Sequence, residues 1–486
     1  MLFNSAAFLF FFTAFFPVYW LLNRDVRWRN AWTLAASYFF YACWDWRFLF
    51  LLMFSTLVDY CVGRALHATP GGNGPVRRRY LVASLVTNLG ILGTFKYFGF
   101  FVDSFVDLLA AFGIEAHRPT LNVVLPVGIS FYTFQSLSYT IDIYRGRMRP
   151  ARNLLNLAAY VSFFPQLVAG PIERSGHLLP QIESRARLTL DAAVDGGWLI
   201  LWGRVKKMLV ADRVAVYVNT VFATPDAYSP ATCLMAVVLF AVQIYCDFSG
   251  YSDIARGTAK LLGIDLMVNF RTPYFATSLR DFWHRWHISL STWFRDYLFI
   301  PLGGSKGSPW LTRRNILATF IVSGLWHGAA YTYLIWGALH GIGYLLDPFS
   351  RKGMTGAPRR GWASSLAGWA CTFAFVNVAW VFFRASSLSD ALTILGKIAS
   401  PSAWLEALAG AHPALERVAM SSAEAAAAAL IIGMVFVTEW IGKGQGIDRM
   451  MAASRPAVRW GYSWLLLGVF LLMPPSDSGA FIYFQF

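Results

Sequence analysis

The chain contains few charged residues and few cysteines. Only 14% of its 486 residues are charged, 57% are hydrophobic, and the mean hydropathy is +0.48. Soluble domains do not sustain such a composition over this length. The five cysteines lie in or beside apolar segments without paired spacing. The sequence therefore predicts neither a disulfide framework nor a thiolate metal site.

The sequence motifs of several soluble protein classes are also missing. We find no fixed-period repeat, no Walker or Rossmann glycine pattern and no soluble domain. The net charge of +15 could suggest nucleic acid, but the basic residues cluster in short connections between apolar runs. That distribution is typical of the cytoplasmic loops of membrane proteins. We therefore expect membrane lipid around the chain and no nucleic-acid partner.

Apolar runs recur along the whole chain, near the ~20 residues that cross ~30 Å of hydrocarbon. They cover residues 5–22, 30–43, 48–65, 80–98, 121–143, 232–247, 316–346, 366–383, 425–440 and 460–473. Several are short, so tilted, broken or re-entrant helices are expected. The sequence predicts an all-α, polytopic membrane protein, with residues 1–486 in one domain.

Basic residues after the first, third and fifth apolar runs indicate the topology. They are Arg24, Arg27 and Arg29, then Arg77, Arg78 and Arg79, then Arg145, Arg147, Arg149 and Arg152. An N-terminus outside the cytoplasm places all three loops inside, as the positive-inside rule requires. The first run has no basic segment before it and no small-residue cleavage site, so we expect an uncleaved span.

Three further segments depart from simple spans. Residues 154–170 are interrupted by Pro165 and flanked by basic residues on both sides, which predicts a re-entrant or interfacial element. Residues 196–218 carry charges on an apolar helix, at Arg204, Lys206, Lys207 and Arg213. Either an interfacial helix or a protein-lined channel would explain them. Residues 385–422 are polar and rich in alanine, and we expect surface helix there without a readable function.

His327 is a titratable side chain inside the apolar run 316–346. A polar group at membrane depth normally faces a bundle interior or a wet cavity, so it is a candidate for chemistry. Helical rise would place it ~20 Å beyond the basic Arg314. The alternative is a core histidine bonded to a neighbouring carbonyl. Small-residue pairs around it would allow close helix packing; they are Gly324 and Gly328, and Gly337 and Gly341.

Residues 281–304 form the densest polar and aromatic stretch. On one continuous helix, its tryptophans and Leu290 would form a stripe, and His287 would lie one turn from His284. An interfacial helix with an aromatic belt is one reading. A metal site on His284 and His287 is another, but the spacing and the third ligand of zinc motifs are missing. Upstream, Asp247 could face a cavity or interfacial water, whereas an interfacial position suits Asp253 better.

Five segments in chain order resemble the membrane-bound O-acyltransferase family, most closely its polysaccharide-acetylating branch. They are residues 163–172, 245–253 and 282–304, Trp326-His327-Gly328, and residues 481–486. The resemblance implies a bundle of roughly 11–13 transmembrane or re-entrant helices around a central funnel. It also implies that residues 282–304 and 316–346 carry the catalytic core. By the same resemblance His327 is the catalytic histidine, and His287 fills a second polar position held by asparagine or histidine among relatives.

The residues suit that chemistry. Acyl transfer from a thioester to a hydroxyl needs a base of near-neutral pKa and a donor for the developing oxyanion. We expect His327 to be the general base and His287 to position the acceptor or stabilise charge. Arginine suits phosphate geometry, so Arg285 and Arg295 are candidates to contact an anionic donor. Alternatively, they pair with Asp281 and Asp296. Further candidates for substrate binding are Trp326, Tyr245 and Asp247.

The expected protein is thus an O-acyltransferase of the bacterial inner membrane. The resemblance implies acetyl-coenzyme A as donor substrate, no bound cofactor or metal, and periplasmic acetyltransferase or polysaccharide-modifying partners. The acceptor could be alginate, cellulose, another exopolysaccharide or peptidoglycan. A transporter or channel that uses His327 in a proton or substrate pathway is the competing hypothesis. It gives no reason for the sequence of residues 282–304, and the inverted repeat expected of many transporters is missing.

Overall fold

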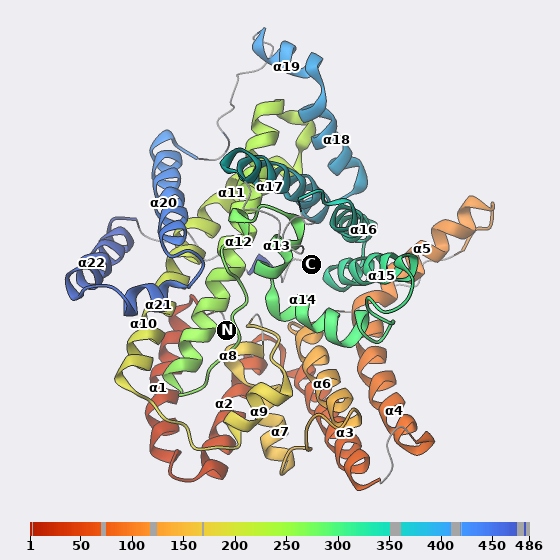
Figure 1. Cartoon of the computed structure of the whole chain (residues 1–486), viewed down its shortest axis with the longest axis vertical. Coiled ribbons are helices and arrows are strands. Elements are labelled where there is room, and N and C mark those ends of the chain that lie inside the picture. The colour runs from red at the N-terminus through yellow and green to blue at the C-terminus, as the bar shows by residue number, and fades with distance from the viewer. Residues whose placement is uncertain are drawn as a thin grey trace. The chain divides into compact units, whose positions relative to one another are not determined.

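The structure is a computed structural model that describes residues 1, 3–69, 74–116, 124–167, 170–349, 361–409, 418, 420–473 and 481–482 (Figure 1). These residues are predominantly helical and include no β-strand, which confirms the all-α prediction. The chain divides into two compact units. One comprises Met1–Gly197 and Ala255–Met267, and the other comprises Trp198–Ile254 and Val268–Phe486. The single-domain expectation stays a prediction.

Within the described residues, five helical stretches are long and apolar enough to cross a membrane. They are Val26–Ala68, Pro75–Ala111, Pro230–Leu261, Trp362–Arg384 and Ser422–Ile441. Two shorter apolar helices, Ala6–Leu22 and Pro456–Leu472, accompany them. Many large apolar side chains are exposed, such as Leu471 at 84%. Lipid rather than water explains this exposure, and the chain is a multi-pass membrane protein.

The first unit contains helices α1 to α9 and most of α10. Their bounds are α1 Ala6–Leu22, α2 Val26–Asp45, α3 Leu49–Ala68, α4 Pro75–Leu92, α5 Phe98–Ala111, α6 Ile129–Tyr144, α7 Leu154–Val161, α8 Phe164–Leu167, α9 Ser175–Ile182 and α10 Leu190–Arg204, with short turns η1 Trp46–Phe48 and η2 Gly93–Tyr97. Side-chain caps begin several of them; Asp25 caps α2 and Asn153 caps α7. Helices α3, α4 and α6 pack against one another (Figure 1).

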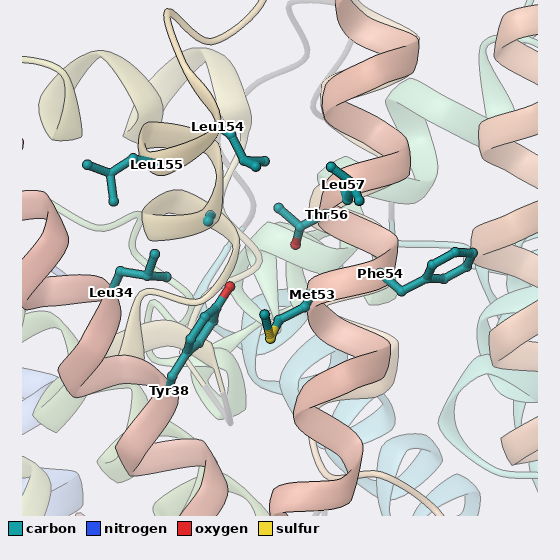
Figure 2. A pocket seen from close by; sticks show the side chains of 9 residues that line it. Leu34, Tyr38, Met53, Phe54, Thr56, Leu57, Leu154 and Leu155 are labelled. Atoms are coloured by element: carbon teal, nitrogen blue, oxygen red, sulfur yellow. The ribbon is translucent and has the colours of Figure 1, made fainter.

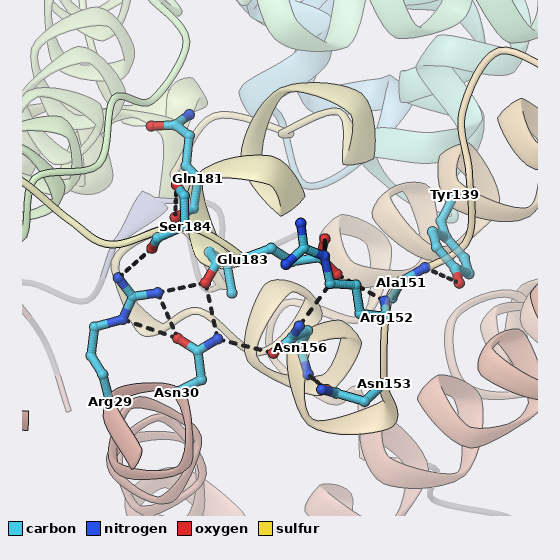
Figure 3. A network of polar contacts seen from close by, with 11 residues as sticks. Arg29, Asn30, Tyr139, Ala151, Arg152, Asn153, Asn156, Gln181, Glu183 and Ser184 are labelled. Carbon is cyan, nitrogen blue, oxygen red and sulfur yellow. Dashed lines mark hydrogen bonds and ion pairs between the residues drawn. The ribbon is translucent and has the colours of Figure 1, made fainter. Parts of the chain in front are cut away.

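A buried polar network joins α2, α7 and α9 in this unit (Figure 3). The guanidinium of Arg29 donates to the Ser184 carbonyl oxygen at 2.7 Å and to the Asn30 amide oxygen at 2.8 Å. The Asn30 amide donates to Asn156 at 3.0 Å, and Asn156 donates to Glu183 at 3.3 Å. The sequence grouped Arg29 with the loop charges, but the structure buries it on α2. Carbonyl and amide oxygens hold its charge there.

The segment 154–170 forms two short buried helices, α7 and α8, with 8 and 4 residues. Neither approaches the length of a membrane crossing. Residues 168 and 169 lie outside the described residues. The re-entrant or interfacial assignment stays a prediction.

The second unit contains the end of α10, most of α12 and all the other helices that follow α10. The bounds are η3 Val205–Ala211, α11 Asp212–Ala223, η4 Pro225–Ala227, α12 Pro230–Leu261, η5 Pro273–Phe275, α13 Leu279–Arg285, α14 Ile288–Phe294, η6 Arg295–Phe299, α15 Pro309–His327, α16 Tyr331–Leu346, α17 Trp362–Arg384, α18 Leu388–Ala399, α19 Pro401–Leu408, α20 Ser422–Ile441, α21 Ile447–Ala452 and α22 Pro456–Leu472. Helices α15 and α16 form its most closely packed pair, and α17 packs on α16. The loop 385–422 contributes α18 and α19; residues 410–417 and 419 lie outside the described part.

Candidate functional site

His287 lies at a break between two helices, not on one continuous helix as the sequence analysis expected. Helix α13 ends at Arg285, Trp286 has an extended backbone (φ −100°, ψ 128°), and α14 begins at Ile288. His287 itself adopts the left-handed conformation, with φ 42° and ψ 53°. That conformation costs a non-glycine residue about 1 kcal/mol. The predicted aromatic stripe and the one-turn spacing of His284 and His287 were therefore wrong.

Hydrogen bonds from residues 269–271 replace those that the broken helix loses. The Arg271 N–H donates to the Arg285 carbonyl at 2.9 Å, and the Ile288 N–H donates to the Asn269 carbonyl at 2.9 Å. The Asn269 side-chain oxygen also accepts from the Ser289 hydroxyl at 3.0 Å. Because these bonds satisfy backbone groups on both sides of the break, the left-handed residue is held in place.

His327 is the last residue of α15, where a short turn leads into α16. The two helices approach closely through glycines. A Cβ on Gly324 would lie 2.2 Å from the Tyr333 carbonyl oxygen, and one on Gly337 would lie 2.4 Å from the Phe320 carbonyl oxygen. Only glycine permits such contacts. The small residues noticed in the sequence thus fix the hairpin that carries His327.

The break and the hairpin bring the two histidines together. Their ring centroids are 6.3 Å apart, with the ring planes at 52°. His287 is fully buried, and His327 is 4% exposed. Trp326 neighbours both rings, at 4.9 Å from His327 and 6.2 Å from His287. Two titratable imidazoles therefore share one enclosed site.

Aromatic side chains from other helices close around these rings. Phe248 of α12 meets the His287 ring edge-on at 4.6 Å. Trp336 and Phe383 meet the His327 ring at 5.1 Å and 5.2 Å. Such walls exclude water and fix ring orientation, and both effects favour proton transfer at a defined atom.

Tyr245 belongs to a buried ionic network rather than to an open binding surface. Its hydroxyl lies 2.8 Å from both carboxylate oxygens of Glu439. Lys206 Nζ lies 2.6 Å from Asp253 Oδ2 and 4.0 Å from Glu439 Oε1. Asp253, for which the sequence favoured an interfacial position, is thus an ion-pair partner. Paired and hydrogen-bonded charges of this kind are the form in which buried ions are tolerated.

Asp247 is held by a second network. Lys207 Nζ lies 2.9 Å from Asp247 Oδ1 and 2.7 Å from Asp212 Oδ1. Asp247 Oδ2 accepts a hydrogen bond of 2.8 Å from the Ile482 N–H. Beside it, the ring of Phe481 lies 4.6 Å from Tyr251 and 5.8 Å from Phe248. Asp247 therefore fixes residues 481–482 next to the ring that packs on His287; residues 483–486 lie outside the described part.

Close approach of α10 and α12 places both lysines. A Cβ on Gly203 would lie 2.5 Å from the Gly250 carbonyl oxygen, so the two backbones touch there. Lys206 and Lys207 follow at once and meet the carboxylates of α12. The charges in residues 196–218 raised two possibilities in the sequence, interfacial exposure or a lined channel. For these two lysines the structure gives burial against protein carboxylates.

The two arginines proposed for the donor form ion pairs with neighbouring carboxylates. Arg285 Nε lies 2.8 Å from Asp281 Oδ1, and Arg295 Nε lies 2.8 Å from Asp296 Oδ1. His284 is exposed and contacts the Arg280 carbonyl. Among the described residues, no group of three or more His, Cys, Asp or Glu side chains has the arrangement of a metal site.

Sequence reasoning missed several residues that build the site. His340 is fully buried on α16, where Trp336 lies 4.8 Å and Trp283 lies 5.0 Å from its ring. The sequence did contain a signal for His340, because it is a second histidine in the apolar run 316–346. Phe248 lies in the resembling segment 245–253, but its contact with His287 could not be predicted. Asn269 and Phe383 gave no signal, because their contribution depends on contacts between distant segments.

Comparison with known proteins places this arrangement in context. The model of the membrane-bound O-acyltransferase family matches residues 147–388. The probable alginate O-acetylase AlgI of Pseudomonas aeruginosa is 41% identical over 404 residues, which cover 83% of this chain and 76% of that protein. The protein of the same name from Azotobacter vinelandii is 40% identical, with 83% and 79% covered.

The chain is also similar to a protein named for a different acceptor, peptidoglycan. The peptidoglycan O-acetyltransferase of Helicobacter pylori is 35% identical over 432 residues, which cover 81% of this chain and 79% of that protein. These relatives share a group-transfer activity and differ in the polymer that they modify.

Proposed function

The chain belongs to the membrane-bound O-acyltransferase family, and we propose that it transfers acetyl from cytoplasmic acetyl-coenzyme A toward an extracytoplasmic polysaccharide such as alginate. That it is an O-acyltransferase follows from its family and its relatives. The family and the relatives give no support to the competing hypothesis of a transporter or channel. The donor, the acceptor and the roles of the histidines are the proposal.

The pairing of His287 and His327 carries the proposal. The two rings share an enclosed, aromatic site with centroids 6.3 Å apart. In the proposed step, His327 takes the proton of the acceptor hydroxyl while the hydroxyl oxygen attacks the thioester carbonyl carbon. The carbon–sulfur bond then breaks, and the leaving thiolate takes the proton held by His327, so that coenzyme A leaves as its thiol and the imidazole is neutral again. The helix break at His287 holds its imidazole opposite His327, which supports a role for both side chains.

In this proposal His287 orients the acceptor hydroxyl or donates a hydrogen bond to the developing oxyanion. Trp326 forms a wall beside both rings. Tyr245 and Asp247 hold the surrounding framework through their buried partners, Glu439 and Lys207. Arg285 and Arg295 are assigned to the anionic donor, and each would have to exchange its carboxylate partner for phosphate.

Transfer of acetyl across the membrane implies partner proteins on the periplasmic side. We propose that periplasmic acetyltransferase or polysaccharide-modifying proteins complete the reaction, and that the chain lies in the bacterial inner membrane with its N-terminus periplasmic. The basic loops after the first, third and fifth apolar runs support that topology.

Sided membrane vesicles test this function. Inverted vesicles contain the protein in their membrane and enclose its periplasmic partner and polymannuronate. Acetyl-coenzyme A is added on the outside. Mass spectrometry then measures acetyl ester on the enclosed polymer. Ester that requires the wild-type chain supports the proposal. Ester on enclosed peptidoglycan fragments alone would change the acceptor, and no ester on either polymer would contradict the proposed transfer.

A further inference from the structure

An apolar groove lies in the first unit between α2, α3 and α7 (Figure 2). Its volume is about 450 Å³, within the usual range for small-molecule sites. Helix α2 contributes Leu34 and Tyr38, α3 contributes Met53 and Leu57, and α7 contributes Leu154 and Ala158. Met53 and Leu57 are 43% and 48% exposed, so the groove is open on its α3 side. In a membrane protein, the apolar material that reaches such a groove is lipid.

The groove has a defined direction. In Figure 2, Leu34 lies above Tyr38 on α2, Leu57 lies above Met53 on α3, and Leu154 lies near the upper end. Helix α2 therefore runs away from the upper end, whereas α3 runs toward it. Residues that precede Leu34 on α2 and residues that follow Leu57 on α3 must lie beyond this same end.

Arginines lie beyond that end on α2, on α3 and just before α7. Arg27 is seven residues before Leu34 and Arg64 is seven residues after Leu57, which is ~10 Å of helical rise on the same face as the lining side chains. Arg152 comes just before Asn153, the cap of α7. Its Nε lies 3.3 Å from Glu183 Oε2. Arg27 and Arg64 are exposed, and the described residues supply no partner for either guanidinium.

We propose that this groove binds an anionic glycerophospholipid. One acyl chain lies along α2, α3 and α7, and the phosphate lies beyond Leu34 and Leu57 among Arg27, Arg64 and Arg152. An apolar groove that ends in a basic cluster matches both parts of such a lipid. The positive-inside pattern puts this end at the cytoplasmic leaflet, where anionic lipids and basic residues meet.

Native mass spectrometry of the full-length, detergent-purified protein tests the site. Phosphatidylglycerol and phosphatidylcholine with identical acyl chains are added in competition, and retained lipid is counted. We expect selective retention of one phosphatidylglycerol. The triple variant Arg27→Gln/Arg64→Gln/Arg152→Gln should lose that selectivity, on the order of five-fold in affinity for each arginine. Arg78→Gln/Arg79→Gln, on exposed positions of α4, should keep it.

A second variant tests the groove itself. Leu57→Trp fills it from an exposed helix face and should reduce retention of both lipids, whereas Val86→Trp on α4 should not. Equal retention of the two lipids by the wild-type protein would overturn the proposal without any variant. Selectivity that survives in a monodisperse triple variant, or wild-type retention by Leu57→Trp, would overturn it as well.

Discussion

The rings of His287 and His327 lie 6.3 Å apart although a helix, a π-helical turn, a loop and the whole of α15 separate them in the chain. One ring is held by a left-handed residue at a helix break, and the other by a helix end against a glycine-lined hairpin. Both supports are strained or tight features of the backbone. Such features persist only where the surrounding structure maintains them, and they cluster at functional sites.

Substitutions of His287 separate the side chain from its backbone conformation. Asparagine and glycine both tolerate the left-handed region, whereas alanine does not. We expect His287→Asn to retain transfer within about ten-fold of wild type, and His287→Gly to fold normally but to lose on the order of 10²-fold. His287→Ala should lose activity and also melt at a lower temperature. Initial rates of ester formation and melting temperatures check this, and equal rates for the Asn and Gly variants would remove the polar role of His287.

Lys207 links Asp212, Asp247 and, through Asp247, the backbone at Ile482. Lys207→Met would leave two buried carboxylates without their cation. Breaking a buried ion pair in this way costs about 3–5 kcal/mol. We expect a marked fall in the melting temperature in detergent.

Lys306→Met is the matched control for Lys207, because Lys306 is an exposed lysine in the loop before α15. It should melt like the wild type. Similar melting temperatures for the two variants would show that the Lys207 network contributes little to stability.

Gly324→Ala should perturb the hairpin that carries His327. Its Cβ would overlap the Tyr333 carbonyl oxygen at 2.2 Å, so α15 and α16 would have to separate. Overpacking of this kind costs about 1–3 kcal/mol. We expect lower stability and slower transfer. Gly433→Ala on α20 is the control, because a Cβ there meets nothing within 4 Å. A Gly324→Ala protein that matches this control in rate and melting temperature would contradict the account of the hairpin.

The sequence predicted what depends on local composition. Apolar runs identified the helices, and a histidine within such a run identified His327 as a candidate. The break at His287 was missed because residues 281–297 have a helical pattern, and the bonds that end the helix come from Asn269 and Arg271. The partners of Tyr245 and Asp247 were missed for the same reason. Glu439 and Lys207 lie far from them in the chain, and spacing carries no information about such contacts.

Release of coenzyme A tests the central claim most directly. Purified wild-type, His327→Ala and His284→Ala proteins are incubated with acetyl-coenzyme A, the periplasmic partner and polymannuronate, and free thiol is measured over time. The account predicts release by the wild type and by His284→Ala, whose imidazole is exposed on α13. It predicts a loss on the order of 10²–10⁴-fold in a folded His327→Ala protein. Wild-type release by a well-folded His327→Ala protein would contradict the assignment of His327 as the general base.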